Sequence, residues 1–168
     1  MPASDLVSIR STAERLRVPE IRVWPGANRL ACARVNPETP GLHPHYTLIC
    51  DDVRLELGNR FSLIGVFQNI VTAQLPISLV KLAAVTYWHG QGTGAAQVRV
   101  VSPDRTEVIV ISEPTTIDLP AGGFTHNVVL FVNVVLQREG TYWVQTLLDS
   151  KVVGEVPFSV VLQQPESA

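Results

Sequence analysis

The residues of this chain best suited to chemistry are its histidines. His43 and His45 flank Pro44, so their imidazoles could supply two ligands to a metal, and Asp51 and Asp52 follow a few residues later. A catalytic zinc site takes three protein ligands, however, and neighbouring carboxylates on a strand point to opposite faces. We therefore expect a Pro-rich surface loop here, with no bound metal or cofactor.

A second candidate is the string Gly90-Gln91-Gly92-Thr93-Gly94. Glycine-rich loops cradle phosphate groups when a strand precedes them and a helix follows, because the helix N-terminus supplies N–H donors. Residues 95–100 (Ala-Ala-Gln-Val-Arg-Val) have the pattern of another strand, and no Lys-Ser or Lys-Thr pair follows. The string is therefore predicted to be a flexible hairpin tip and not a phosphate site.

The two cysteines, Cys32 and Cys50, are the candidate nucleophiles. Neither has a second cysteine two to four residues away, so the usual structural zinc site is not indicated. Neither has a nearby His-Asp context, and there is no Gly-x-Ser-x-Gly elbow. We expect two reduced thiols, with a single bridge as the open alternative. No catalytic residue is assigned, and the protein is predicted not to be an enzyme.

Composition sets the class of structure that carries these residues. The chain has 168 residues, of which 46% are hydrophobic and 17% charged, which excludes wholesale disorder. Val, Ile and Thr number 25, 9 and 12. Their β-branched side chains fit a pleated sheet better than a helix, so an all-helical protein is excluded.

Net charge and hydropathy argue against nucleic acid and membranes as partners. Thirteen basic and fifteen acidic residues give a net charge of -2, without the basic excess that phosphate neutralisation requires. The sequence has no apolar run of about 18 residues, and no apolar stretch typical of a secretory signal near its start. We expect no nucleic-acid partner, no membrane span and a cytoplasmic location.

The chain divides near residue 45. Residues 1–44 hold half of the 12 prolines. Within them, Ser11 and Glu14 match a helix-capping box, and Pro19 would end such a helix. This segment is predicted to be a Pro-rich arm, either partly disordered or packed on the domain. Residues 45–163 form the expected domain, and 164–168 a tail.

From residue 46 onward, short segments of alternating hydrophobicity follow one another between Gly-, Pro- and Asp-containing turns. With no helix between them, they predict a single β-sandwich, C2-like or immunoglobulin-like. The segment 127–136 is apolar on both faces, which is typical of a central strand or of one that meets a partner. The expected strands are 47–57, 61–67, 79–88, 97–101, 107–112, 115–119, 127–136, 141–148 and 152–162.

Register predicts the form of the first hairpin. A two-residue loop at Gly58-Asn59 would place apolar residues opposite polar ones. A three-residue loop places Leu55 opposite Phe61 or Leu63 and keeps the apolar set on one face. We therefore expect an odd-length loop with Gly58 or Asn59 at positive φ.

Tyr142 lies in the sequence Gly140-Thr141-Tyr142-Trp143-Val144. This resembles the tyrosine corner of immunoglobulin-like domains, in which the hydroxyl bonds to backbone a few residues upstream. The cysteine that antibodies place two residues later is replaced by Val144. A plain core aromatic residue is the alternative.

Function is expected to reside in sheet faces or strand edges of a non-catalytic binding or assembly module. If segments 127–136 and 141–148 are apolar on both faces, something must cover one face: the N-terminal segment, a second subunit in a homo-oligomer, or another protein. The alternatives are a phage-derived or secretion-particle structural subunit and a metal-dependent hydrolase. The candidate partner contacts are Trp88, Gly90, Gly92, Gly94, Phe131 and Trp143.

The stretch Cys50-Asp51-Asp52-Val53-Arg54, followed by Leu63-Ile64-Gly65-Val66-Phe67, resembles the opening of a family of small bacterial proteins of unknown function. Leu75-Pro76 and the late Gly140-Thr141-Tyr142 fit the same pattern. The resemblance covers residues 46–162 and implies a cytoplasmic β-sandwich, with no catalytic residues to transfer. The opening strand of such proteins usually lies close to the start, so the 44 residues before it here depart from the pattern.

Overall fold

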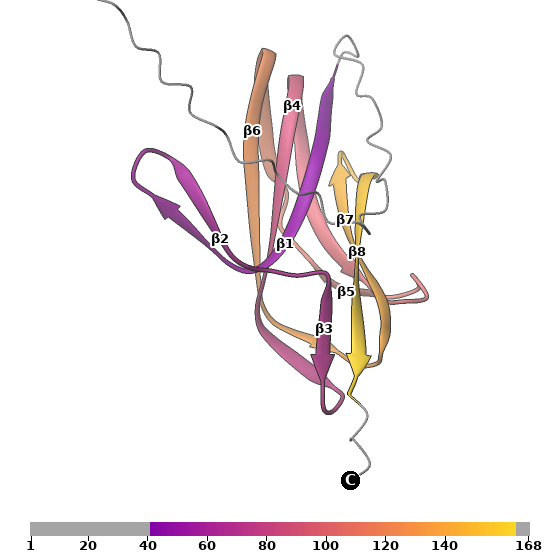
Figure 1. The fold of residues 1–168 in the computed structure, drawn as a ribbon. Coiled ribbons are helices and arrows are strands. Elements are labelled where there is room, and N and C mark those ends of the chain that lie inside the picture. The colour runs from indigo at the N-terminus through magenta and orange to yellow at the C-terminus, as the bar shows by residue number, and fades with distance from the viewer. Residues whose placement is uncertain (1–40, 164–168) are drawn as a thin grey trace, which may run out of the picture. The chain divides into compact units, whose positions relative to one another are not determined.

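The computed structural model describes residues 41–163, which form eight strands and no helix (Figure 1). The expectations for Ser11, Glu14, Pro19 and Cys32 lie outside these residues. The strands are β1 (Leu42–Glu56), β2 (Arg60–Val66), β3 (Asn69–Thr72), β4 (Ile77–Val101), β5 (Val108–Ile111), β6 (Thr115–Leu136), β7 (Gly140–Leu148) and β8 (Lys151–Leu162).

The strands belong to one open, mixed sheet with the order β2-β1-β4-β7-β8-β3, and both β5 and β6 pair with β4. All pairs are antiparallel except β3 with β8, which is parallel. The expected all-β class is therefore confirmed. Within the described residues no helix is long and apolar enough to cross a membrane.

The longest strand, β4, organises the sheet. Its first part pairs with β1 and with the end of β6, and its last part pairs with β7, β5 and the start of β6. The sequence reading of two strands, 79–88 and 97–101, joined by a hairpin tip is wrong, because Gly90–Gly94 lies within β4. Likewise, 115–119 and 127–136 are parts of one strand.

The glycines of β4 mark a bend and not a loop. The register between β4 and β6 shifts from Gly90↔Gly123 to Gly92↔Leu119, and both β4 glycines have positive φ, 122° and 111°. Gly122 on β6, at φ 70°, lies opposite this bend, within the shifted part of the β4–β6 register. Because L-residues rarely adopt such angles, glycine permits both strands to bend here without ending.

The main core cluster joins side chains from both parts of β4. Leu82 and Ala84 pack in one cluster with Val98 and Val100, and Phe158 of β8 belongs to the same cluster. Three buried threonine hydroxyl groups form two hydrogen bonds: Thr47 Oγ1 lies 3.0 Å from Thr86 Oγ1 and 3.0 Å from Thr146 Oγ1. These hydrogen bonds connect β1 to β4 and also to β7, with which β1 does not pair.

The turns that the sequence predicts are largely present. Leu55 pairs with Phe61, so the β1–β2 loop has three residues, and both Gly58 and Asn59 have positive φ. The β7–β8 hairpin turns over Asp149 and Ser150 as expected, also at positive φ. Two elements differ. The short strand β3 had no sequence prediction, and the domain's first strand begins at Leu42.

Candidate functional site

All four histidines of the chain gather on one face of β1, β4 and β6. In β4, Leu82, Ala84 and Trp88 point into core clusters. The alternate residues, including Tyr87 and His89, therefore occupy the opposite face, which we call the outer face. The cross-strand pairs His43↔His89, Tyr46↔Tyr87, Tyr87↔His126 and His89↔Phe124 bring the neighbouring strands' rings beside them. We call the group of eight rings the aromatic–histidine cluster: His43, His45, Tyr46, Phe61, Tyr87, His89, Phe124 and His126.

The centre of the cluster is a stacked pair of tyrosines. The rings of Tyr46 and Tyr87 lie 5.3 Å apart and are inclined by only 12°. His126 lies against both, with its ring 4.9 Å from Tyr87 and its Nε2 atom 3.1 Å from the Tyr46 hydroxyl. Phe61, on the β2 side of the hairpin, packs its edge on His126 at 5.7 Å. The rings therefore fix one another in place.

The other end of the cluster is a group of three imidazoles. The ring of His89 lies 5.7 Å from that of His43 and 5.7 Å from that of His45. Burial lowers the pKa of His89, and the neighbouring charges that His43 and His45 acquire on protonation lower this pKa further. The Nε2 atom of His89 is buried and has no hydrogen-bond partner in the described part of the chain.

These histidines do not lie in the loop that the sequence predicts. His43, Pro44 and His45 are part of β1, with a register shift between Pro44 and Tyr46. In residues 41–163 no group of three or more His, Cys, Asp or Glu side chains is arranged to hold a metal.

Asp51 and Asp52 diverge, as expected of neighbours on a strand. Asp52 forms an ion pair with Lys81 at 3.2 Å, and the hydrogen bond from that ammonium group lowers the carboxyl pKa. Asp51 lies against Gly65 on β2. Cys50 is fully buried, and burial raises the pKa of its thiol, which disfavours the thiolate that a nucleophile requires.

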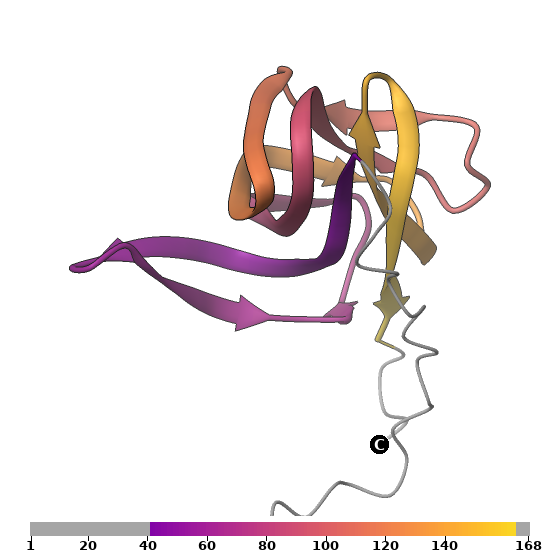
Figure 2. The same cartoon turned by 90° about the horizontal axis from the view of Figure 1, so that it is seen from above.

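Much of the cluster is open to solvent. Phe124 is 68% exposed, and Tyr46 is 40% exposed. The outer face continues along β6 with Leu130 and Val132, which are 49% and 63% exposed. Farther down β1 and β4, the same face is covered by the β1–β2 hairpin, where Leu63 packs on a small core cluster. Figure 2 shows this hairpin running across β4 and β6.

The residues predicted to contact a partner do not form one exposed surface. Trp88 and Phe131 are buried, at 0% and 6% exposure, so their side chains are not surface contacts in this conformation. Gly90, Gly92 and Gly94 lie in β4, at and beyond its bend, instead of in a protruding tip.

Trp143 remains partly exposed, away from the cluster. The guanidinium group of Arg105 lies 4.0 Å from the centre of its indole ring, in a cation–π contact. Arg105 also forms an ion pair with Glu155 at 3.2 Å. Trp143 is therefore covered in part by a salt-bridged side chain.

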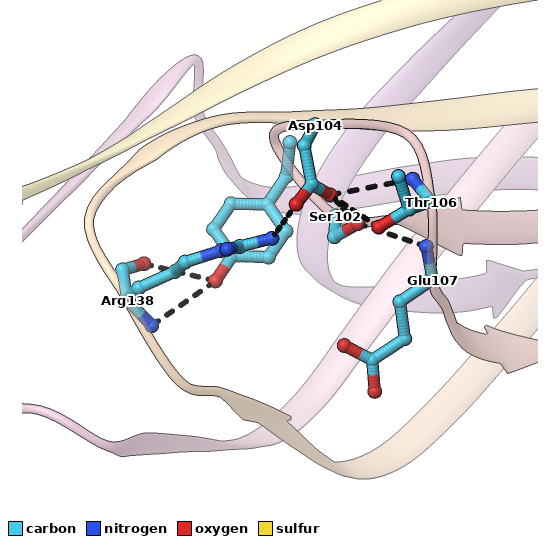
Figure 3. A network of polar contacts seen from close by, with 6 residues as sticks. Ser102, Asp104, Thr106, Glu107 and Arg138 are labelled. Carbon is cyan, nitrogen blue, oxygen red and sulfur yellow. Dashed lines mark hydrogen bonds and ion pairs between the residues drawn. The ribbon is translucent and has the colours of Figure 1, made fainter.

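The loop between β4 and β5 carries a separate polar network (Figure 3). Ser102 Oγ donates to Asp104 at 2.6 Å, and both the backbone N–H and the hydroxyl of Thr106 donate to the same carboxylate. Arg138 forms an ion pair with Asp104 at 2.6 Å. The hydrogen bond from Ser102, followed by those from Arg138 and Thr106, holds the pKa of Asp104 well below its usual range. The carboxylate thus serves to anchor the loop.

Arg138 links this loop to the predicted tyrosine corner. The Tyr142 hydroxyl donates to the Arg138 backbone oxygen at 2.9 Å and accepts from the Arg138 N–H at 3.3 Å. The hydroxyl-to-backbone contact expected for Tyr142 is therefore confirmed. The ring itself is buried and stacks on Phe158 at 5.5 Å.

Sequence reasoning missed the aromatic–histidine cluster as a unit. One local signal was present: Tyr87 with His89, and Phe124 with His126, have the two-residue spacing that places neighbours on one face of a strand. The pairing of β1 and β6 on either side of β4 was needed to bring these pairs together.

Residues 45–161 match the sequence profile of a family of unknown function (DUF6941). No curated protein matches the chain. Among solved structures, a Pseudomonas fluorescens alkylpurine DNA glycosylase (AlkC) bound to DNA containing an abasic site analogue aligns with 73% of this chain and 31% of its own, at 9% identity and a TM-score of 0.47.

Two further structures align less well. A Listeria innocua β-glucosidase in complex with glucose covers 56% of this chain and 15% of its own, at 11% identity and a TM-score of 0.39. The CARDB domain of a Pyrococcus furiosus protein in complex with di-metal ions covers 75% and 97%, at 15% identity and a TM-score of 0.38. The chain thus spans about a third of the glycosylase and less of the glucosidase. At such scores these likenesses establish no common fold.

Proposed function

The chain belongs to this family of unknown function, and we propose that its domain is a non-catalytic binding or assembly module that holds a partner protein on the aromatic–histidine cluster. The observation that carries the proposal is the exposure of this ordered group of rings. Phe124 and Tyr46 are 68% and 40% exposed, although each lies in ring contact with other members of the cluster.

Such a surface suits protein recognition for two physical reasons. Aromatic side chains are enriched at the centres of interfaces, where they supply large apolar area with few rotatable bonds. Here the Tyr46–Tyr87 stack and the His126 contact already restrict the rings, so little conformational entropy is left to lose on binding. The imidazoles and the tyrosine hydroxyls can hydrogen-bond at the rim.

The non-catalytic character is supported by the state of the acidic groups and the thiol. Asp52 and Asp104 are engaged in ion pairs with Lys81 and Arg138. Cys50 is buried, with a raised pKa. These groups have structural roles that account for their positions.

We further propose that the sheet is a β-sandwich of the immunoglobulin-like or C2-like kind, in a cytoplasmic bacterial protein. The core cluster shared between both parts of β4 and β8 supports the sandwich. The Tyr142 hydroxyl on the Arg138 backbone supports the immunoglobulin-like alternative. The low cysteine content supports the location.

The proposal is tested by capture of partners from a lysate of the source organism with the full chain. The test variant is Phe124→Ser, and the matched control is Val71→Ser on β3, a position 57% exposed and outside the cluster. We expect a protein that binds the wild type and the control, and whose Kd for Phe124→Ser, titrated with the purified partner, is about tenfold higher or more. Retention of no protein, or equal affinity of both variants, would contradict the proposal.

A further inference from the structure

Strand β6 has an unpaired edge. Along Phe124–Leu136 it pairs with β4 alone, and in residues 41–163 no strand lies on its other side. Figures 1 and 2 show it at the end of that part of the sheet. Every second residue of such a strand turns its N–H and C=O groups away from the sheet, where they can pair with another strand. Of the two sequence readings of 127–136, the central strand is thereby wrong, and contact with a partner stays a prediction.

This edge lacks the features that usually prevent pairing. Proteins protect exposed edges with charged residues, proline, bulges or a covering segment. Phe124–Val132 contains no Asp, Glu, Lys, Arg or Pro, and Leu130 and Val132 are 49% and 63% exposed. The first irregularity comes at Asn133, whose φ is 54° and which has no pairing partner on β4.

A hollow marks the far end of the unpaired edge. A hollow of about 280 Å³ lies between β5 and the end of β6. Its walls include Ile109 and Val110 from β5 and the residues Val132–Val135 from β6. The hollow thus borders β6 only at Val132–Val135, so an added strand would pair with the segment before Asn133.

We infer that a second copy of this chain pairs with this edge, so that two Phe124–Val132 segments form an antiparallel ladder across a twofold axis. The segment is suited to pair with itself for three reasons. It has no fixed charge, so no like charges meet across the axis. Its exposed residues Phe124, Leu130 and Val132 share one face, so pairing that matches even-numbered residues keeps these apolar side chains together. An antiparallel homodimer also uses the same patch on both copies, as twofold symmetry requires.

The dimer would extend the outer face. Phe124 and His126 belong to the aromatic–histidine cluster and lie on the paired segment, so the clusters of the two copies would lie toward opposite ends of the ladder, on one continuous face. The inference goes beyond the proposed function, because it concerns a strand edge and holds whether or not the cluster binds another protein.

The test is sedimentation velocity of the full chain over about 1–100 μM, a range that spans typical weak-to-moderate dimer affinities. We expect a reversible dimer of twice the 18.4 kDa chain mass. Val132→Lys places an ammonium group beside the edge of each copy and should raise the dimer Kd at least tenfold. The matched control, Val152→Lys on β8, at a position 44% exposed, should leave it unchanged.

Amide hydrogen exchange of the wild type supplies a second readout that needs no variant. Alternate amides within 124–132 should become protected as the concentration rises. A monomer across the whole range would overturn the inference, as would equal weakening by both lysine variants. Protection of 124–132 that does not depend on concentration would also overturn it, because the edge would then be covered within a single chain.

Discussion

Tyr142→Phe isolates the contribution of one hydroxyl group. The phenyl ring of the variant can keep the stacking on Phe158, 5.5 Å away, so packing changes little. The hydroxyl is lost together with its two hydrogen bonds to the Arg138 backbone, at 2.9 and 3.3 Å. These bonds hold the segment that joins β6 to β7.

The magnitude follows from those two bonds. Each hydrogen bond contributes a net ~0.5–1.5 kcal/mol, and a partner left unsatisfied adds a cost of similar size. We therefore expect Tyr142→Phe to lower the free energy of unfolding by about 2 kcal/mol. For a domain of this size that corresponds to a fall in Tm of about 6–12 °C.

The assay is urea denaturation followed by far-ultraviolet circular dichroism. The midpoint should fall while the slope m stays constant, since the buried area is unchanged. The control is Tyr46→Phe, which removes an exposed hydroxyl that, among residues 41–163, bonds only to His126, and it should cost less than about 0.5 kcal/mol. A Tyr142→Phe effect no larger than that of Tyr46→Phe would refute the assignment of a structural role to the hydroxyl.

Two further predictions concern the bend of β4 and the histidines. An added Cβ at Gly90 would collide with a backbone carbonyl oxygen, whereas at Gly92 it would meet open space, although both have positive φ. Gly90→Ala should therefore destabilise the protein by about 1–3 kcal/mol more than Gly92→Ala in the same urea assay; equal effects would exclude a close approach. Because the pKa of His89 is lowered from 6.5, the unfolded chain binds more protons as the pH falls below about 6.5, and stability should drop there. His89→Gln should flatten this fall between pH 7.5 and 5.5, and an unchanged slope would show that His89 does not cause it.

Local sequence was sufficient for the class of fold and for the two hairpins at Gly58-Asn59 and Asp149-Ser150. The odd-length loop at Gly58-Asn59 could be predicted because moving the register by one residue turns every side chain of a strand to the other face. Leu55 opposite Phe61 was therefore a consequence of the apolar pattern itself. The turn at Asp149-Ser150 was predictable because two turn-forming residues separate two apolar segments.

Local sequence was insufficient where a glycine-rich string could either turn or bend the chain. Gly90–Gly94 has the composition of a hairpin tip, and only the pairing of β4 with β6 on both sides of the string shows that the strand continues. The same pairing places β6 at an edge, although the apolar pattern of 127–136 was equally consistent with a central strand. The hydrophobic pattern of a strand does not report how many neighbouring strands it has: Leu130 and Val132 are apolar but 49% and 63% exposed.

The sequence by itself thus determined that the chain from residue 46 onward forms strands, and that tight turns fall at Gly58-Asn59 and Asp149-Ser150. The tertiary structure alone decided that His43, Tyr87 and His126, from three strands far apart in the chain, lie on one exposed face. The physical reason is that the two-residue period of a strand fixes the face of each side chain. The choice of neighbouring strand depends on how the whole sheet buries its core.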